Sequence, residues 1–69
     1  MIRKPVVSSN IRSIGYDPGT RRLEVEFSGG DVYSYHDVGE EEHRHLMNAA
    51  SIGKHFQMHI KHRHTHSKH

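Results

Sequence analysis

The chain has 69 residues, a formal net charge of +2 at pH 7 and no cysteine. A chain of this length forms one small domain with a modest core, and the lack of cysteine excludes disulfides and cysteine-based metal sites. No apolar run approaches the ~18 residues of a membrane-spanning helix, and the first ten residues lack the apolar core of a secretory signal. We therefore expect a soluble cytoplasmic protein.

The charges fall into three segments. Residues 1–22 carry a net charge of +4, residues 23–42 hold seven acidic and no basic side chains, and residues 43–69 carry +5 with no acid. Six of the nine histidines also lie between positions 55 and 69. A basic, histidine-rich C-terminal third suits an anionic partner, although a solvated tail has the same composition.

The first expected strand covers residues 11–16, after a frayed start at residues 1–5. Ile14 and Tyr16 alternate with smaller or polar residues there. Residues 17–20, Asp-Pro-Gly-Thr, then form a turn, because Pro presets φ at its second position and Gly tolerates positive φ at its third.

Residues 21–28 and 31–36 predict a β-hairpin, because apolar and polar residues alternate on both sides of a glycine-containing loop. With the strand before them they form a three-stranded antiparallel meander, since a parallel arrangement needs crossovers that the short loops do not provide.

The direction of the two tyrosines on the last strand depends on the hairpin loop. A loop of Gly29 and Gly30 alone would turn Tyr33 and Tyr35 to the outer face of the sheet. A three-residue loop that includes Ser28, with Gly30 in the left-handed region, would turn them toward the core. The larger apolar area buried by two inward tyrosines favours the second register.

Two short helices are expected after the sheet. Glu40 to Glu42 form an acidic first turn, with Asp37 as a candidate cap, and Leu46 starts an apolar face. Apolar residues at positions 52, 56 and 60 then recur every four residues and predict a second amphipathic helix. Residues 64–69 contain no apolar side chain and are expected to be a disordered tail.

The predicted fold is thus α+β. Residues 1–63 form a single domain with a three-stranded antiparallel meander and two short α-helices packed on one face, followed by a disordered histidine-rich tail at residues 64–69.

One ordered set of residues carries a family resemblance: Ile14-Gly15-Tyr16-Asp17, Leu23, Val25, Phe27, Gly30, Tyr33-Ser34-Tyr35, Val38, Leu46, Ala49, Ser51, Gly53, Phe56 and Ile60. This set resembles the KTSC domain, which is named for its occurrence at the C-terminus of some lysyl-tRNA synthetases and also occurs alone in bacterial proteins. The resemblance covers about residues 6–62, with Tyr-x-Tyr as its centre. It implies RNA binding through association with the synthetase. Gly39 and His55 depart from the pattern, which commonly has Pro and an aromatic residue there.

The expected nucleic-acid contacts are basic and aromatic side chains, mostly on the second helix and the residues after it. The basic and histidine side chains would contact phosphates, and the tyrosines would either stack on bases or lie in the core with their hydroxyls at the surface. The set is Tyr33, Tyr35, Arg44, Lys54, His55, His59, Lys61, His62 and Arg63.

The histidine spacing also suits metal ions, since His55 and His59, and His59 and His62, share helix faces. No third ligand is implied, so we expect adventitious affinity and no physiological metal or other cofactor. No glycine-flanked nucleophile, tuned acid–base pair or phosphate-cradling loop is present in the sequence.

The sequence therefore predicts a small non-enzymatic binding module for RNA or another nucleic acid. The alternative is a protein-binding accessory or adaptor, such as a bacterial or phage regulator that docks on a larger enzyme.

Overall fold

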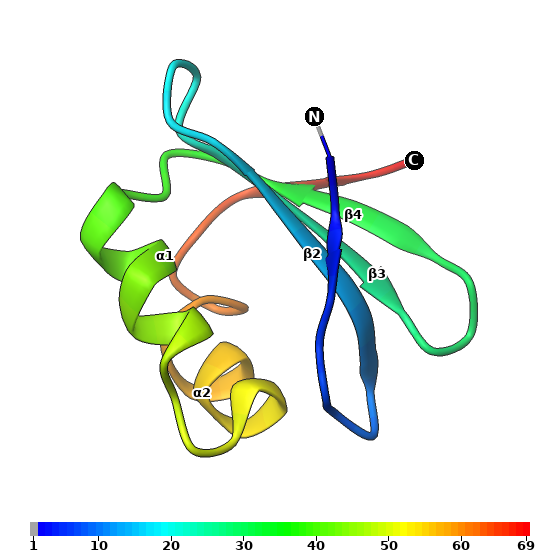
Figure 1. Ribbon diagram of the computed structural model, residues 1–69. Coiled ribbons are helices and arrows are strands. Elements are labelled where there is room, and N and C mark those ends of the chain that lie inside the picture. Colours follow the sequence, from blue (N-terminus) through cyan, green and yellow to red (C-terminus); the bar gives the residue numbers. More distant parts are fainter. Residues whose placement is uncertain (1) are drawn as a thin grey trace.

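A computed structural model describes residues 2–69 of the chain (Figure 1). Five strands and two helices follow in the order β1 (Lys4–Pro5), β2 (Ile11–Asp17), β3 (Arg22–Phe27), β4 (Val32–Tyr35), α1 (Glu40–Met47), α2 (Ile52–His59) and β5 (His66–Lys68). All strand pairs are antiparallel, and the strands lie in the sheet in chain order. The predicted α+β class, with an antiparallel sheet and two helices, is confirmed.

The prediction of three strands is wrong, because the sheet has two further strands at its edges. β1 and β5 are two and three residues long, and all their residues are exposed. Such strands are held by backbone hydrogen bonds to a neighbour and need no apolar alternation. β1 thus corrects the frayed start expected for residues 1–5, of which Met1 lies outside the described residues.

β5 also corrects the disordered tail expected at residues 64–69. Tyr35 and Tyr33 of β4 pair with His66 and Lys68 of β5. The His69 N–H donates to the Val32 carbonyl oxygen at 2.8 Å, which extends this pairing beyond the strand. The edge of β4 offers unpaired backbone groups, and a segment of polar residues satisfies them as well as an apolar one would.

The hairpin between β3 and β4 has the three-residue loop. The Phe27 N–H donates to the Asp31 carbonyl oxygen at 2.8 Å, and Gly30 has a φ of 99°. This register pairs β4 with β3 so that Tyr33 and Tyr35 lie on the same face as the apolar residues of β3. The prediction that both tyrosines turn toward the core is confirmed.

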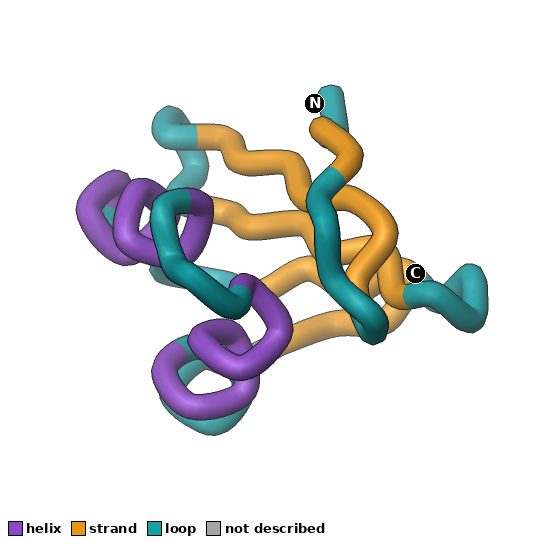
Figure 2. Tube along the Cα trace, turned by 60° about the horizontal axis from the view of Figure 1, so that its bottom comes forward, coloured by secondary structure: helices purple, strands orange, loops and turns teal. Residues whose placement is uncertain are grey.

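Both helices lie on the same side of the sheet (Figures 1 and 2). The core contains side chains from both layers: Ile11, Ile14, Leu23, Val25 and Tyr35 of the sheet, and Val38, Leu46, Phe56 and Ile60 of the helical half. The ring of Phe56 lies 5.1 Å from the ring of Tyr35, which joins α2 to β4.

The helix N-termini are capped by backbone and side-chain groups. Gly39 is the N-cap of α1, and its N–H donates to the Glu42 carboxylate at 3.2 Å. The expected cap, Asp37, lies two residues earlier with a φ of 59°, and its carboxylate pairs with Arg21 at 3.2 Å. Ser51 caps α2 by accepting a hydrogen bond from the Lys54 N–H.

No helix in residues 2–69 has the length and apolar character needed to cross a membrane.

Candidate nucleic-acid interface

A hollow of about 300 Å³ is lined by residues of β3, β4, β5 and the segment that follows α2. We call it the aromatic hollow. Its lining residues are Phe27, Asp31, Tyr33, Tyr35, Lys61 and His66. They come from β3, the hairpin loop, β4, the turn after α2, and β5, so β5 supplies one wall of the hollow through His66.

Tyr33 is the central ring of the aromatic hollow. It is partly buried, and its centroid lies 5.7 Å from Phe27, edge to face, and 5.6 Å from the imidazole of His66. Its ring and that of His66 are therefore held in place by neighbours while both still border the hollow. This arrangement leaves aromatic surface for a flat ligand to contact.

Tyr35 supports the hollow from the core. Its side chain is only 3% exposed, and its ring contacts Phe56 and lies 5.3 Å from His66. Burial, and then the neighbouring Tyr33, raise the pKa of Tyr35, so its phenol stays neutral at physiological pH. Of the two predicted stacking residues, only Tyr33 has the exposure that stacking requires.

One lysine lines the aromatic hollow, and a second pairs with one of the lining residues. Lys61 follows α2 directly, and its N–H donates to the Phe56 carbonyl oxygen at 2.9 Å, which fixes where its side chain starts. Lys68 of β5 pairs with Asp31 at 3.6 Å. Within residues 2–69, Lys61 has no carboxylate within ion-pairing distance, so its charge is available to an anion.

Arg44 and Lys54 do not join this site. Arg44 lies in α1, pairs with Glu41 at 3.0 Å and borders a different hollow, next to Tyr16 and His43. Lys54 lies in the first turn of α2 and borders a third hollow with the serines of residues 8–9. The prediction that one basic surface contains all these side chains receives no support from this placement.

The predicted histidines on α2 form a separate cluster. The rings of His55 and His59 are 4.5 Å apart, and they border a hollow of about 210 Å³ with His45 and Arg63. Burial lowers the pKa of His55, and the positive charges of His59 and His45 lower it further. Within residues 2–69, no group of three or more potential ligands is arranged to hold a metal ion.

The turn after α2 places the remaining predicted residues near one another. Lys61, His62 and Arg63 are exposed, and the Arg63 N–H donates to the Ile60 carbonyl oxygen at 3.1 Å. Lys61 borders the aromatic hollow, whereas Arg63 borders the histidine cluster. The turn therefore separates the two surfaces.

The sequence pattern did not indicate that Phe27, Asp31 and His66 belong to this site. His66 lies in residues 64–69, which were expected to be a disordered tail. The one sequence signal for β5 is the alternation of the long side chains of His66 and Lys68 with the short Ser67. This signal is easily missed because the segment contains no apolar residue.

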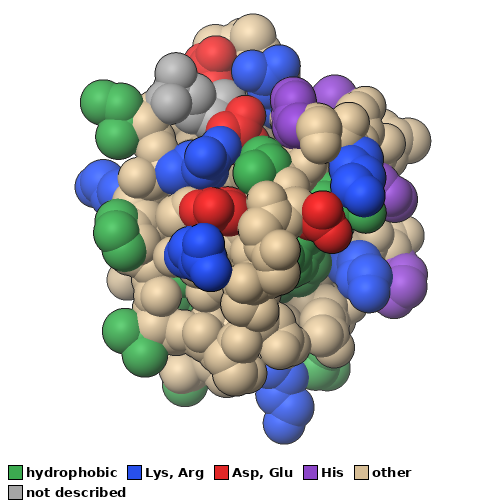
Figure 3. All heavy atoms as spheres, turned by 90° about the vertical axis from the view of Figure 1, so that its right-hand side faces the viewer, with side chains coloured by type: hydrophobic (Ala, Val, Ile, Leu, Met, Phe, Trp, Pro, Cys, Tyr) green, Lys and Arg blue, Asp and Glu red, His purple; other side chains and the backbone are tan. Residues whose placement is uncertain are grey.

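The outer face of the sheet, opposite the helices, carries paired charges. Figure 3 shows this side of the molecule, with acidic and basic side chains next to one another. Glu24 contacts both Arg3 and His69, and Glu26 accepts a hydrogen bond from the Ser13 hydroxyl and pairs with Arg12 at 3.7 Å. This pairing makes the outer face a poor surface for a phosphate backbone.

Comparisons with known proteins give a consistent family relationship. Residues 7–64 match the model of the KTSC domain. An uncharacterized protein from Stutzerimonas stutzeri is 45% identical over 64 residues, which are 93% of this chain and 90% of that protein. A lysine–tRNA ligase from Nostoc punctiforme is 40% identical over 53 residues, which are 77% of this chain and 9% of the ligase. The crystal structure of a KTSC domain protein from Yersinia pestis superposes with a TM-score of 0.93 at 43% identity, covering 99% of this chain and 96% of that one.

Proposed function

The chain belongs to the KTSC domain family, and we propose that it is a small non-enzymatic cytoplasmic module that binds single-stranded RNA in the aromatic hollow. The observation that supports this most directly is a partly buried tyrosine ring beside an imidazole, with an unpaired lysine at the rim. Base stacking on an aromatic side chain contributes ~1–3 kcal/mol in single-strand binders. A lysine next to such a ring is placed to contact the adjoining phosphate.

A single strand fits this site better than a duplex. Stacking on Tyr33 requires a base whose flat face is free, and bases in a duplex are stacked on one another. The similarity to part of a lysine–tRNA ligase supports RNA over DNA as the ligand. The fixed cations here are few, Lys61 in the lining and Lys68 paired with the lining residue Asp31, so binding will be weak and salt-sensitive.

The test is a fluorescence-anisotropy titration with a labelled single-stranded RNA of about ten nucleotides. It compares the matching DNA and the RNA duplex at about 50 and 200 mM salt. Tyr33→Leu keeps most of the apolar volume but removes the stacking face, and should weaken binding about 5- to 150-fold. Lys61→Gln should weaken binding less and flatten its salt dependence.

Lys54→Gln is the matched control, because Lys54 is an exposed lysine of α2, the helix that Lys61 follows, but borders a different hollow. It should leave the affinity unchanged. Equal effects of Lys54→Gln and Lys61→Gln would contradict binding in the aromatic hollow, and no binding to any single strand would refute the RNA function.

A protein-binding adaptor is the second candidate, and the open sheet favours it. β1 and β5 are both edge strands, so each offers backbone groups to a strand of a partner. A pull-down from nuclease-treated lysate separates the two functions: one protein retained after treatment would favour the adaptor, and loss of all partners would favour RNA.

A further inference from the structure

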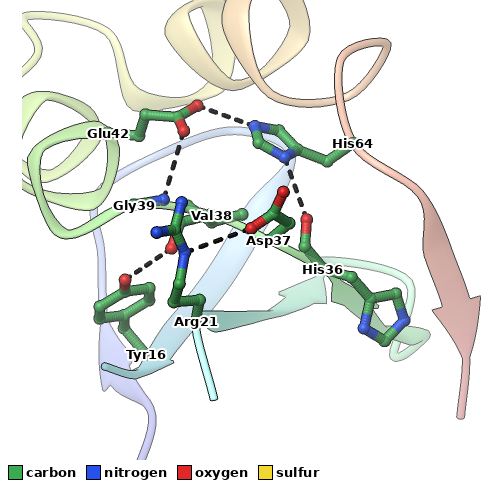
Figure 4. Close-up of polar contacts among 8 residues, drawn as sticks. All are labelled: Tyr16, Arg21, His36, Asp37, Val38, Gly39, Glu42 and His64. Carbon is green, nitrogen blue, oxygen red and sulfur yellow. Dashed lines mark hydrogen bonds and ion pairs between the residues drawn. The ribbon is translucent and has the colours of Figure 1, made fainter. Parts of the chain in front are cut away.

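The side chain of His64 lies between α1 and the loop that leads into it (Figure 4). Its Nδ1 is 3.0 Å from the carbonyl oxygen of His36, and its Nε2 is 2.8 Å from Oε2 of Glu42. The side chain is only 10% exposed, so water does not replace these partners easily. Both ring nitrogens therefore face oxygen atoms of the protein.

These two partners require a doubly protonated ring. A carbonyl oxygen only accepts hydrogen bonds, and so does an ionised carboxylate. A neutral imidazole has a single N–H, so it would leave the lone pair of its other nitrogen facing an oxygen at about 3 Å. Only the imidazolium form of His64 donates to His36 and Glu42 at once.

Glu42 is held in its ionised form. Its Oε1 accepts a hydrogen bond from the Gly39 N–H, which adds to the bond from His64. Burial raises the pKa of Glu42, but the hydrogen bonds from His64 and Gly39 and the positive charge of Arg21 outweigh this and lower it overall. The carboxylate is thus an acceptor throughout the range in which histidines titrate.

Other charged or titratable groups lie near this contact on the loop side and on the helical side. Arg21 pairs with Asp37 in the loop that also contains the His36 carbonyl, which reduces the effect of either charge on His64 (Figure 4). On the helical side, the hollow that Glu42 borders also has the titratable or charged side chains of His45, His55, His59 and Arg63.

The contact is located at the start of β5. Thr65 follows His64, and its carbonyl oxygen accepts a hydrogen bond from the His36 N–H at 2.9 Å. β5 begins at the next residue, His66, which is part of the wall of the aromatic hollow. Of residues 64–69, only His64 is partly buried. The other side-chain contacts of this segment, those of His69 with Ser34 and of Lys68 with Asp31 among them, are made by exposed residues.

We propose that protonated His64 is a latch that holds β5 on the edge of β4, and that loss of its proton releases β5 and dismantles the aromatic hollow. The latched form binds one more proton than the released form, so a rise in pH favours release. The consequence for RNA binding rests on the proposed function, whereas the latch itself does not.

The first test is NMR of the wild-type chain between about pH 5 and pH 8. The ¹⁵N shifts of the His64 ring should report two protonated nitrogens at the acidic end. The His69 and His36 N–H groups form hydrogen bonds across the β4–β5 edge. As the pH rises, their exchange protection should fall relative to that of amides in the β2–β3 pair. The fall should reach at most about tenfold per pH unit, which is the limit for the release of one proton. A neutral His64 ring with both amides still protected would overturn the latch.

The second test uses His64→Gln, with His62→Gln as its control, because His62 is an exposed histidine in the preceding turn. His64→Gln should show low protection at the two amides across the whole pH range, and His62→Gln should match the wild type. Equal protection in the two variants would overturn the latch. If His64→Gln does not fold, the wild-type titration alone decides.

An RNA titration on the same proteins separates the latch from the proposed function. His66 and other histidines also change charge with pH, so the measured quantity is the difference in pH dependence between wild type and His64→Gln. Protection that falls with pH in a chain that binds no RNA would support the latch and refute RNA binding. Tyr33-dependent RNA binding with protection that does not change with pH would support RNA binding and refute the latch.

Discussion

The ring of Phe56 meets the ring of Tyr35 edge to face, with centroids 5.1 Å apart and planes at 82°. Phe56 is 1% exposed and also contacts Phe27 at 5.6 Å, so one side chain of α2 joins two strands. Phe56 is the one buried residue within α2, so the packing of this helix on the sheet depends on its ring.

Phe56→Ala should remove most of the stability of the domain. Replacing a buried phenylalanine by alanine costs ~3–5 kcal/mol, which is a large part of what a domain of this size has. Thermal unfolding followed by circular dichroism is the measurement, with Phe56→Leu as a milder variant. Met58→Ala, at a position 65% exposed on the same helix, should change the free energy of unfolding by less than ~0.5 kcal/mol. A melting temperature for Phe56→Ala close to that of Met58→Ala would contradict this account of the core.

Gly30→Ala should destabilise the domain through its backbone alone. Gly30 has a φ of 99°, and a methyl group added there would meet no atom within 4 Å. The expected cost is ~1–2 kcal/mol, the penalty for an L-residue in the left-handed region. Gly29→Ala, whose added methyl group also has open space, is the control and should be nearly neutral. Urea unfolding of both variants tests the prediction, and equal midpoints would mean that the loop does not require positive φ at residue 30.

Stability should fall at alkaline pH because of two tyrosines. Burial raises the pKa of Tyr16 and of Tyr35, and the charge of Glu40 adds to the rise at Tyr16. The folded state thus favours the neutral phenols. Their contribution to the free energy of unfolding is fully present below the ordinary tyrosine pKa of about 10, and it is lost as the pH rises through the folded-state pKa. Urea midpoints measured from about pH 9 upward should fall.

The Tyr16 hydroxyl gives this alkaline loss a specific cause, since it donates to the Val38 carbonyl oxygen at 2.6 Å and a phenolate cannot donate. Tyr16→Phe should cost ~1 kcal/mol at neutral pH and should flatten the alkaline decline. A decline as steep in Tyr16→Phe as in the wild type would exclude Tyr16 as a contributor.

His43 should weaken the domain in mild acid. Its ring stacks on Tyr16 with centroids 4.4 Å apart, and burial, followed by the charge of Lys4, lowers its pKa. The folded state favours the neutral imidazole, so this contribution is present above the ordinary value of about 6.5 and is lost as the pH falls below it. The measurement is the difference in unfolding free energy between about pH 7.5 and pH 5.5. His43→Gln should show a smaller acid loss than the wild type, and an equal loss would refute the prediction.

The meander could be predicted because its signals are carried by side chains. In residues 11–35 the apolar residues alternate strongly, and a glycine at position 30 permits the loop that turns the tyrosines inward. β1 and β5 gave no such signal, because edge strands made of residues such as Lys4 or His66 are specified by backbone groups of the neighbouring strand.

The site was harder to predict because residues close in sequence point in different directions on a helix. An α-helix turns by 100° per residue, so Lys54 and His55 of α2 border separate hollows. The aromatic hollow instead combines Tyr33, Lys61 and His66, which are brought together by the addition of β5 to the sheet. Without that strand, no spacing in the sequence relates them.

Arg3 and His69 contact the two oxygens of a single carboxylate, that of Glu24, so the two ends of the described chain lie on the outer face of the sheet (Figure 1). An affinity tag or surface linker attached at either end would therefore hold the molecule by that face and leave the helical side turned toward solution. Immobilised in this way, the domain would present both helices to an analyte in one defined orientation.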